Sequence, residues 1–136
     1  MFKTILVPID IGNATESNNT IKIAAANGNA DARIILLNVV EEIPKWAMVE
    51  MPEGIQEKSF KTSKEGLQKI ADGCDVKTEV EVRVGHPYHT ILEVAQETGA
   101  ELIVIASHQP GLQDYLLGST AAKVVRHAHC SVLVVR

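Results

Sequence analysis

Apolar, β-rich runs alternate with amphipathic segments along the whole chain, and this alternation constrains the fold more than any other feature. The apolar runs predict strands at residues 4–9, 33–40, 78–84, 101–107 and 131–136. Each intervening segment contains helical periodicity or helix-capping residues. A repeated β-α order of this kind predicts one open, doubly wound α/β sheet of five parallel strands, with helices on both faces.

The apolar pattern within each run predicts the order of the strands in the sheet. The first, second and fourth runs are apolar almost throughout, as in "RIILLNVV", which is typical of strands covered on both faces. The third run, "TEVEVRV", alternates strictly and is typical of a strand at the edge of the sheet. We therefore expect the order 3-2-1-4-5.

Capping residues mark the ends of two of the predicted helices. Asn13 is followed three residues later by Glu16, a pairing typical of a helix start, and Gly28 is a candidate C-terminal stop. Pro87 suits the first turn of a second helix and Gly99 suits its end. These signals predict the first and third helices of the α/β pattern.

Two further segments are assigned from their composition. Residues 43–56 contain two prolines, a glycine and no clean periodicity, so we expect a long loop there. Helical character returns from about residue 118 to residue 129. The segment between the fourth strand and this last helix is therefore a connection at one edge of the sheet.

Length and composition limit the classes of function. The 136 residues fit a single domain, residues 1–136, and the net charge of −4 disfavours binding to nucleic acid or to an anionic membrane. Cys74 and Cys130 are too few for a disulfide framework and suit inert core positions in a reducing compartment. The sequence has neither the pattern of a secretory leader nor an apolar run of about 20 residues. We therefore expect a cytoplasmic protein.

The predicted strand order places a ligand crevice at one point of the sheet. The direction of winding reverses between the first and fourth strands, and ligands of open α/β sheets bind there, beyond the carboxyl ends of the strands. Asp10 follows the first strand, and Ala106 and Ser107 end the fourth. These residues are expected to border a binding site.

The connection "ASHQPGLQDYLLGST" leads from this crevice into the last helix. Gly118, Ser119 and Thr120 open that helix, where unpaired backbone N–H groups and a partial positive charge suit a phosphate group. The alternative is that Ser119 or Thr120 simply caps the helix. The position at the crevice favours the phosphate interpretation.

Two other polar residues of the crevice have two interpretations each. Asp10 suits a hydrogen bond to a ribose hydroxyl or a Mg²⁺ ion beside phosphates, but Asp10 and Gly12 also form a typical turn. His108 suits donation to a phosphate, or it is a solvated loop residue. The residues alone leave both choices open.

Four segments together resemble the universal stress protein family, and the likeness covers nearly the whole chain. They are "ILVPID", "IVIASH", "LLGSTAAKVVRHA" and "CSVLVVR", and the spelling "SHxP…YLLGS" is similar to the branch of universal stress proteins F and G. The resemblance implies a nucleotide-binding α/β domain, usually a homodimer, that holds ATP and is induced under stress. It also implies that Pro8, Ile9 and Asp10 contact the adenosine and that backbone at Val39 meets the adenine.

The family's phosphate loop reads G-x-x-G, nine residues, then G-[ST], and this chain departs from it. Gly118-Ser119 supplies the final pair, with Thr120 following, but Ala106 and Gln109 replace the first two glycines. Only eight residues separate Gln109 from Gly118. Glutamine disfavours a positive φ angle, so the departure affects the geometry expected for the triphosphate, although Gln109 could itself donate to a phosphate.

The expected function follows from the crevice and the resemblance. We expect an ATP-binding stress-response protein, with or without Mg²⁺, that acts as a binding or signalling module with at most slow hydrolysis or self-phosphorylation. No general base or transition-state arginine is evident. The alternatives are a nucleotide-free interaction protein of the same fold and a slow ATPase.

The apolar last strand, from Ser131 to Arg136, is expected to pair with the same strand of a second copy in a homodimer. The family resemblance implies the same assembly, and a higher oligomer is left open.

Overall fold

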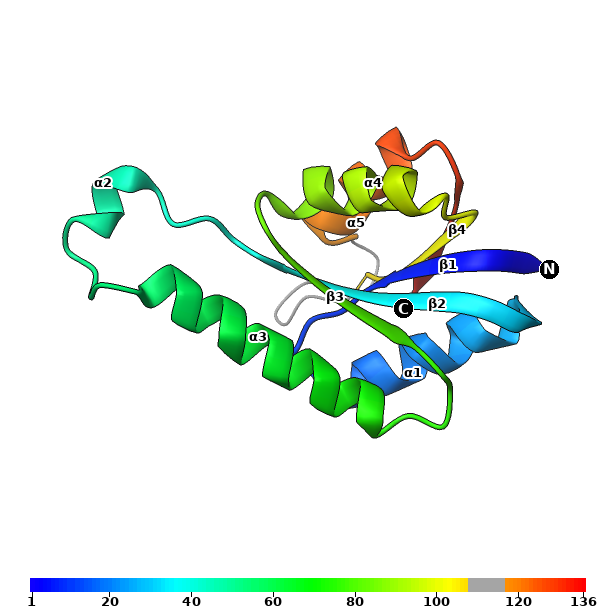
Figure 1. Ribbon diagram of the computed structural model, residues 1–136. Helices are drawn as coiled ribbons and strands as arrows, with labels where there is room; N and C mark the ends of the chain where they lie inside the picture. The colour runs from blue at the N-terminus through cyan, green and yellow to red at the C-terminus, as the bar shows by residue number, and fades with distance from the viewer. Residues whose placement is uncertain (108–116) are drawn as a thin grey trace.

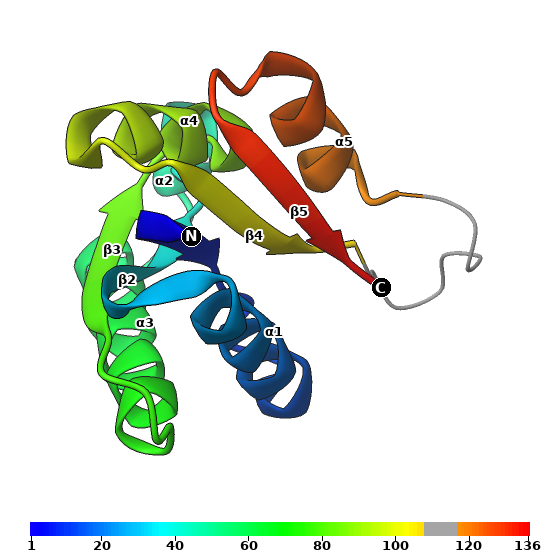
Figure 2. The same ribbon diagram turned by 90° about the vertical axis from the view of Figure 1, so that its right-hand side faces the viewer.

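Strand β1 lies at the centre of a parallel sheet in the computed structural model, which describes residues 1–107 and 117–136. Within these residues the sheet has the order β3-β2-β1-β4-β5. Its strands are β1 (Phe2–Pro8), β2 (Gly28–Val40), β3 (Glu79–Val84), β4 (Leu102–Ala106) and β5 (Ser131–Val135). The predicted fold class and strand order are therefore confirmed, with β3 and β5 at the two edges (Figure 2).

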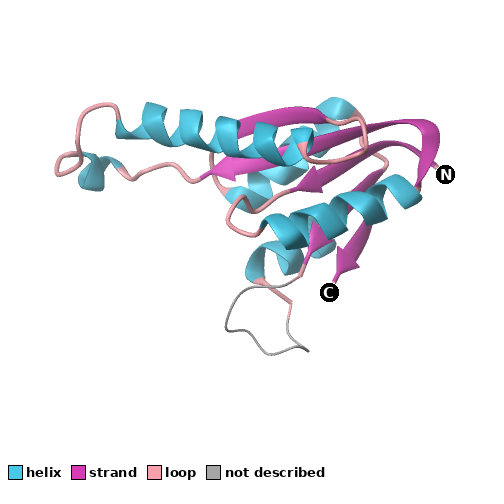
Figure 3. Ribbon diagram, turned by 90° about the horizontal axis from the view of Figure 1, so that it is seen from below, coloured by secondary structure: helices cyan, strands magenta, loops and turns pink. Residues whose placement is uncertain are grey.

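Helices cover both faces of the sheet, as Figure 1 shows. Helices α1 (Ala14–Ala26) and α3 (Ile55–Asp72) lie on one face, and α4 (Pro87–Thr98) and α5 (Ser119–His127) lie on the other. The short helix α2 (Lys45–Met48) lies with the start of α3 away from the sheet (Figure 3).

Alternation along β1 divides the core into two clusters. Ile5 and Val7 pack with Ile21 of α1 and Leu67 of α3, whereas Leu6 packs on the opposite face with residues of α4 and α5. All five of these named side chains are 0% exposed. Burial on both faces explains why β1 reads as an unbroken apolar run.

The sheet divides at the carboxyl end of β1. On one side the ladder between β1 and β2 extends to the pair Pro8 and Leu37. On the other side the ladder between β1 and β4 includes the pair Leu6 and Ile103 and no later one, within the residues that the structure describes. Strand β4 continues instead with β5, as far as Ala106. The ends of β1 and β4 therefore separate, and a crevice opens between the two halves of the sheet.

The predicted capping residues mostly take their expected roles. The Asn13 side chain accepts a hydrogen bond from the Glu16 N–H at 3.1 Å and donates to the Glu16 carboxylate at 3.0 Å. Pro87 is the first residue of α4, and Gly99 ends that helix with a left-handed φ of 68°. Both helix starts, and the end of α4, are thus confirmed.

Two sequence-based assignments are wrong in part. Asn27, not Gly28, caps the end of α1, and Gly28 already begins β2. The first residues of β2 have mostly exposed or half-buried side chains, so no apolar pattern marks them. Residues 43–56 are not one loop, because they contain α2 and the first two residues of α3.

Cys74 and Cys130 are half-buried rather than core residues. Each packs against one of the two apolar clusters, and burial raises the pKa of both thiols. A raised thiol pKa lowers the thiolate fraction and hence the reactivity, in keeping with the inert role predicted for both.

None of the helices in the described parts of the chain combines the length and the apolarity needed to cross a lipid bilayer.

Gly66 of α3 gives a test of how tightly the core cluster around Ile5 and Val7 is packed. A Cβ atom at Gly66 would lie 2.7 Å from Cγ2 of Ile11, in the turn that follows β1. Helix propensity alone favours alanine over glycine by about 1 kcal/mol. We expect Gly66→Ala instead to lower the free energy of unfolding by about 1 to 2 kcal/mol, because the overpacked contact displaces Ile11. Urea denaturation measures this change.

Gly73, at the end of the same helix, is the matched control. Its φ is −81°, and the nearest atom to an added Cβ is 3.5 Å away. Gly73→Ala is therefore expected to be neutral or stabilising. An equal gain in stability from both substitutions would contradict the close contact between Gly66 and Ile11.

Candidate functional site

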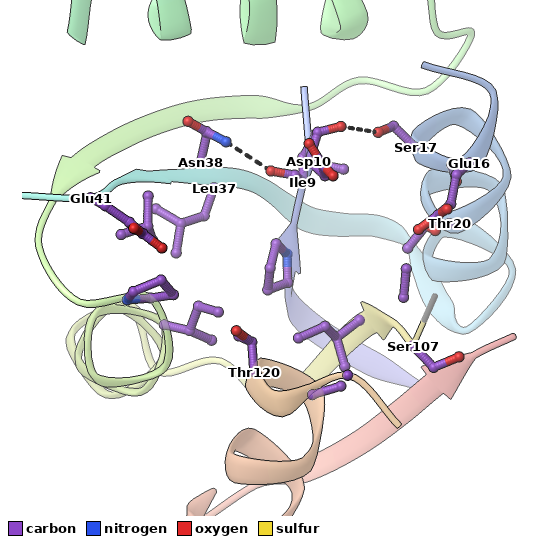
Figure 4. Close-up of a pocket in the computed structure, with 18 residues that line it drawn as sticks. Ile9, Asp10, Glu16, Ser17, Thr20, Leu37, Asn38, Glu41, Ser107 and Thr120 are labelled. Atoms are coloured by element: carbon purple, nitrogen blue, oxygen red, sulfur yellow. Dashed lines mark hydrogen bonds between the residues drawn. The ribbon is translucent and has the colours of Figure 1, made fainter. Parts of the chain in front are cut away.

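A cavity of about 320 Å³ lies in the crevice between the two halves of the sheet (Figure 4). This volume is within the range of small-ligand sites. The carboxyl ends of β1, β2 and β4 border it, together with the first turns of α1, α4 and α5. Its lining within the described residues is Pro8, Ile9, Asp10, Glu16, Ser17, Thr20, Leu37, Asn38, Val39, Glu41, Pro87, Ile91, Ile105, Ala106, Ser107, Gly118, Thr120 and Ala121.

The fold brings together most of the residues that the sequence suggested for the site. Those in the cavity lining are Pro8, Ile9, Asp10, Val39, Ala106, Ser107, Gly118 and Thr120. Ser119 is exposed and does not belong to the lining among the described residues. His108 and Gln109 lie outside the described residues.

Asp10 forms the expected turn while leaving one carboxylate oxygen available. Its Oδ1 accepts a hydrogen bond from the Gly12 N–H at 3.0 Å. Ser17, 4% exposed, donates to the Asp10 carbonyl at 3.1 Å and thereby holds this turn against α1 (Figure 4). Within the described residues, Oδ2 of Asp10 has no hydrogen bond, and the side chain is exposed. The turn and a ligand contact are therefore compatible.

Asn38 is a site residue that the sequence analysis missed. Its side-chain amide donates to the Ile9 carbonyl at 2.9 Å, and Leu37 accepts from the Ile9 N–H at 2.8 Å. These two bonds fix the end of β1 against β2, and Figure 4 shows the one from Asn38 to Ile9. The available signal was a single amide within the apolar run "RIILLNVV", because a polar side chain in a buried strand needs a hydrogen-bond partner.

Backbone hydrogen bonds hold the start of α5 beside the end of β4. The Gly118 N–H donates to the Ser107 carbonyl at 3.2 Å, and the Ser107 N–H donates to Val135 at 2.8 Å. Both ends of the connection between β4 and α5 are thereby fixed at the cavity.

Gly118 is the N-cap of α5, in extended conformation with a ψ of 153°. Among the described residues no side chain caps this helix, so neither Ser119 nor Thr120 takes the capping role considered from the sequence. The two are the first residues of the helix, where backbone N–H groups have no intrahelical partner. The start of α5 therefore offers N–H donors that no side chain of the described chain satisfies.

The ionisable side chains of the lining are all acidic within the described residues. Asp10, Glu16 and Glu41 contribute carboxylates, and the lining within the described residues has no lysine, arginine or histidine. The amino ends of α1, α4 and α5 border the cavity, and the dipoles of these helices favour an anion there. No group of three or more metal-ligating side chains occurs in the residues that the structure describes.

Comparison with known proteins identifies the family. The family model described as "Universal stress protein family" matches residues 1–136 of the sequence. Universal stress protein G of Escherichia coli O157:H7 is 30% identical, and that of Salmonella typhimurium is 31% identical, each over the full length of both chains.

Solved structures agree with this assignment. Hypothetical protein MJ0577 is 26% identical with a TM-score of 0.82, over 99% of this chain and 96% of that one. Universal stress protein UspA from Lactobacillus plantarum is 27% identical with a TM-score of 0.69, over 98% of this chain and 97% of that one. The match to the family model over all 136 residues, together with these full-length similarities, shows that the chain belongs to the universal stress protein family.

Proposed function

We propose that this chain binds ATP at the cavity between the two halves of the sheet and acts as a binding or signalling module of the stress response. The observation that carries the proposal is the pairing of two features in one cavity. Val39 has backbone groups suited to a base, and the first N–H groups of α5, which no side chain of the described residues caps, suit a phosphate.

The base would bind at Val39. Along a parallel strand, the N–H and C=O groups of successive residues point to opposite sides. The Leu37 carbonyl points toward β1, where it accepts from Ile9, and the Val40 carbonyl points toward β3, where it accepts from Gly85. The backbone N–H and C=O groups of Val39 therefore point toward the β1 side, beyond the last pair of that ladder. A donor and an acceptor on one residue suit the adjacent ring nitrogen and amino group of adenine.

The phosphates would bind at the start of α5. The free N–H groups of a helix N-terminus and its dipole favour an anion. Gly118 is buried in the cavity wall and has no side chain to obstruct the approach of an oxyanion. The absence of a capping side chain, among the described residues, leaves these donors to a ligand.

Mg²⁺ fits this arrangement as a partner of the nucleotide. Magnesium commonly takes one or two carboxylates together with phosphate oxygens and water. Asp10 has one carboxylate oxygen that accepts no hydrogen bond within the described residues. The three carboxylates of the lining would repel a bare triphosphate, and a divalent cation would offset this repulsion. We therefore expect Asp10 to hold the cation only when a nucleotide is bound.

Two proteins of the same fold support a nucleotide as the ligand. One is a universal stress protein in complex with cAMP, with 23% identity and a TM-score of 0.69. The other is the universal stress protein from Archaeoglobus fulgidus in complex with dAMP, with 17% identity and a TM-score of 0.61. Each of the two alignments covers more than 95% of this chain and more than 95% of the other chain.

The proposed assembly is a homodimer through β5. This strand lies at the sheet edge, and its apolar residues from Val132 to Val135 are only half-buried. An apolar edge strand with open backbone groups needs to be covered, and the same strand of a second copy could do so with two-fold symmetry.

Nucleotide binding can be tested by isothermal titration with ATP and Mg²⁺. We expect the wild-type protein to bind with a dissociation constant in the micromolar range. Gly118→Val should weaken binding by at least about tenfold, because its side chain would project at the start of α5. Removal of Mg²⁺ with a chelator should also weaken binding, because the lining carboxylates then repel the phosphates.

Val125→Thr is the control for this titration, since Val125 lies on α5 but is 46% exposed and outside the cavity lining. No binding to the wild-type protein, once nucleotide retained through purification has been excluded, would favour a nucleotide-free interaction protein. Steady release of phosphate that Asp10→Ala abolishes would favour the alternative of a slow ATPase.

The dimer can be tested by sedimentation velocity. Leu133→Lys places a charge on β5 and should convert a wild-type dimer to a monomer at micromolar concentration, since an unpaired charge in an apolar interface is costly. Val125→Lys adds the same charge to an exposed position on α5 and should leave the dimer intact. A monomeric wild-type protein, or a dimer that persists in folded Leu133→Lys, would contradict pairing through β5.

A further inference from the structure

The ladder between β1 and β2 ends one hydrogen bond earlier than the lengths of the two strand segments would allow. Its last bond joins the Ile9 N–H to the Leu37 carbonyl at 2.8 Å. The next bond of a parallel ladder would join the Val39 N–H to the Ile9 carbonyl. The register does not contain that bond, and its last pair is Pro8 with Leu37.

Asn38 takes the acceptor that this missing bond would use. Its Nδ2 donates to the Ile9 carbonyl at 2.9 Å, a normal hydrogen-bond length. Asn38 is half-buried, and its side chain projects to the opposite face from its neighbours Leu37 and Val39, which both pack on the α4 and α5 side. The amide can therefore satisfy Ile9 without entering the part of the core that borders α4.

We propose that Asn38 is a positioning residue that ends the β1–β2 ladder early and so keeps the Val39 N–H free for the base of a bound nucleotide. The assignment of a base to Val39 rests on the function proposed above, whereas the competition for the Ile9 carbonyl does not. Without the Asn38 amide, the Val39 N–H is the donor that the order of bonds in a parallel ladder assigns to the Ile9 carbonyl. A buried carbonyl without a partner is unfavourable, so this replacement bond is expected to form.

The first test needs no ligand and measures hydrogen exchange of the Val39 amide by NMR. In the wild-type protein this amide should exchange faster than the amides of Ile9 and Leu37, which lie in the ladder. Asn38→Leu removes the donor and should slow exchange at Val39 by at least about tenfold, as expected for an amide that enters a stable ladder. Asn38→Asp, which keeps the shape but cannot donate when ionised, should act in the same direction.

Asn27 supplies the matched control, because its Nδ2 donates to the Ile23 carbonyl at 2.8 Å and it is also half-buried, but at the amino end of β2. Asn27→Leu should leave exchange at Val39 unchanged. If folded Asn38→Leu and Asn38→Asp both leave the Val39 amide as it is in the wild-type protein, the proposal is wrong. Equal protection of Val39 and Ile9 in the wild-type protein would also overturn it.

The second test measures the effect of Asn38 on base recognition. Asn38→Leu should raise the dissociation constant of ATP about tenfold, the loss of roughly one hydrogen bond. Among 1-deaza, 3-deaza and 7-deaza ATP, the analogue that lacks the accepting ring nitrogen should bind weakly to the wild-type protein and equally weakly to Asn38→Leu. This loss of additivity is the signature of two groups acting on one hydrogen bond.

A purely structural role for Asn38 would weaken ATP and all three analogues by the same factor, and that result would contradict the proposal. If the wild-type protein binds no nucleotide, the function proposed above fails. The exchange of the Val39 amide then decides the role of Asn38 by itself.

Discussion

The whole site depends on how the two ladders of β1 end. The ladder with β2 continues to Pro8, whereas the ladder with β4 includes no pair after Leu6 within the described chain. Because β4 remains paired with β5 up to Ala106, each half of the sheet stays intact while the halves separate. The cavity is thus a consequence of strand pairing, and side chains only complete its walls.

Backbone groups, more than side chains, give this cavity its chemistry. Its described ionisable side chains are all carboxylates, which alone would suit a cation. The opposing features are the first N–H groups of α5 and the end of β2 at Val39. A ligand that combines a base, hydroxyl groups and phosphates with a bound cation meets all of these groups at once.

Much of the fold could be predicted from the sequence, because burial and capping leave local patterns. Continuous apolar runs marked the central strands, alternation marked β3, and the Asn13–Glu16 pair marked the start of α1. The start of β2 at Gly28 left no such pattern, since its first residues pair through backbone and are mostly exposed or half-buried. Helix α2 buries no side chain, so periodicity could not reveal it.

The site was predictable in position but not in its detailed bonding. The reversal of winding placed Asp10 and Gly118 at one crevice, the family resemblance added Val39, and all three line the cavity. The role of Asn38 depends on the carbonyl of Ile9, 29 positions away in the chain, and no local pattern reports such a contact. The cap of α5 was likewise ambiguous, because Gly118, Ser119 and Thr120 are all acceptable N-cap residues from sequence alone.

We propose that one nucleotide spans the cavity from Val39 to the start of α5. A titration of the ¹⁵N-labelled protein with ATP and Mg²⁺, followed amide by amide, tests it most directly. We expect the largest saturable shifts at the amides of Val39, Ser119, Thr120 and Ala121, with one common dissociation constant. Shifts absent from both ends of the cavity, or confined to another surface of the molecule, would contradict it.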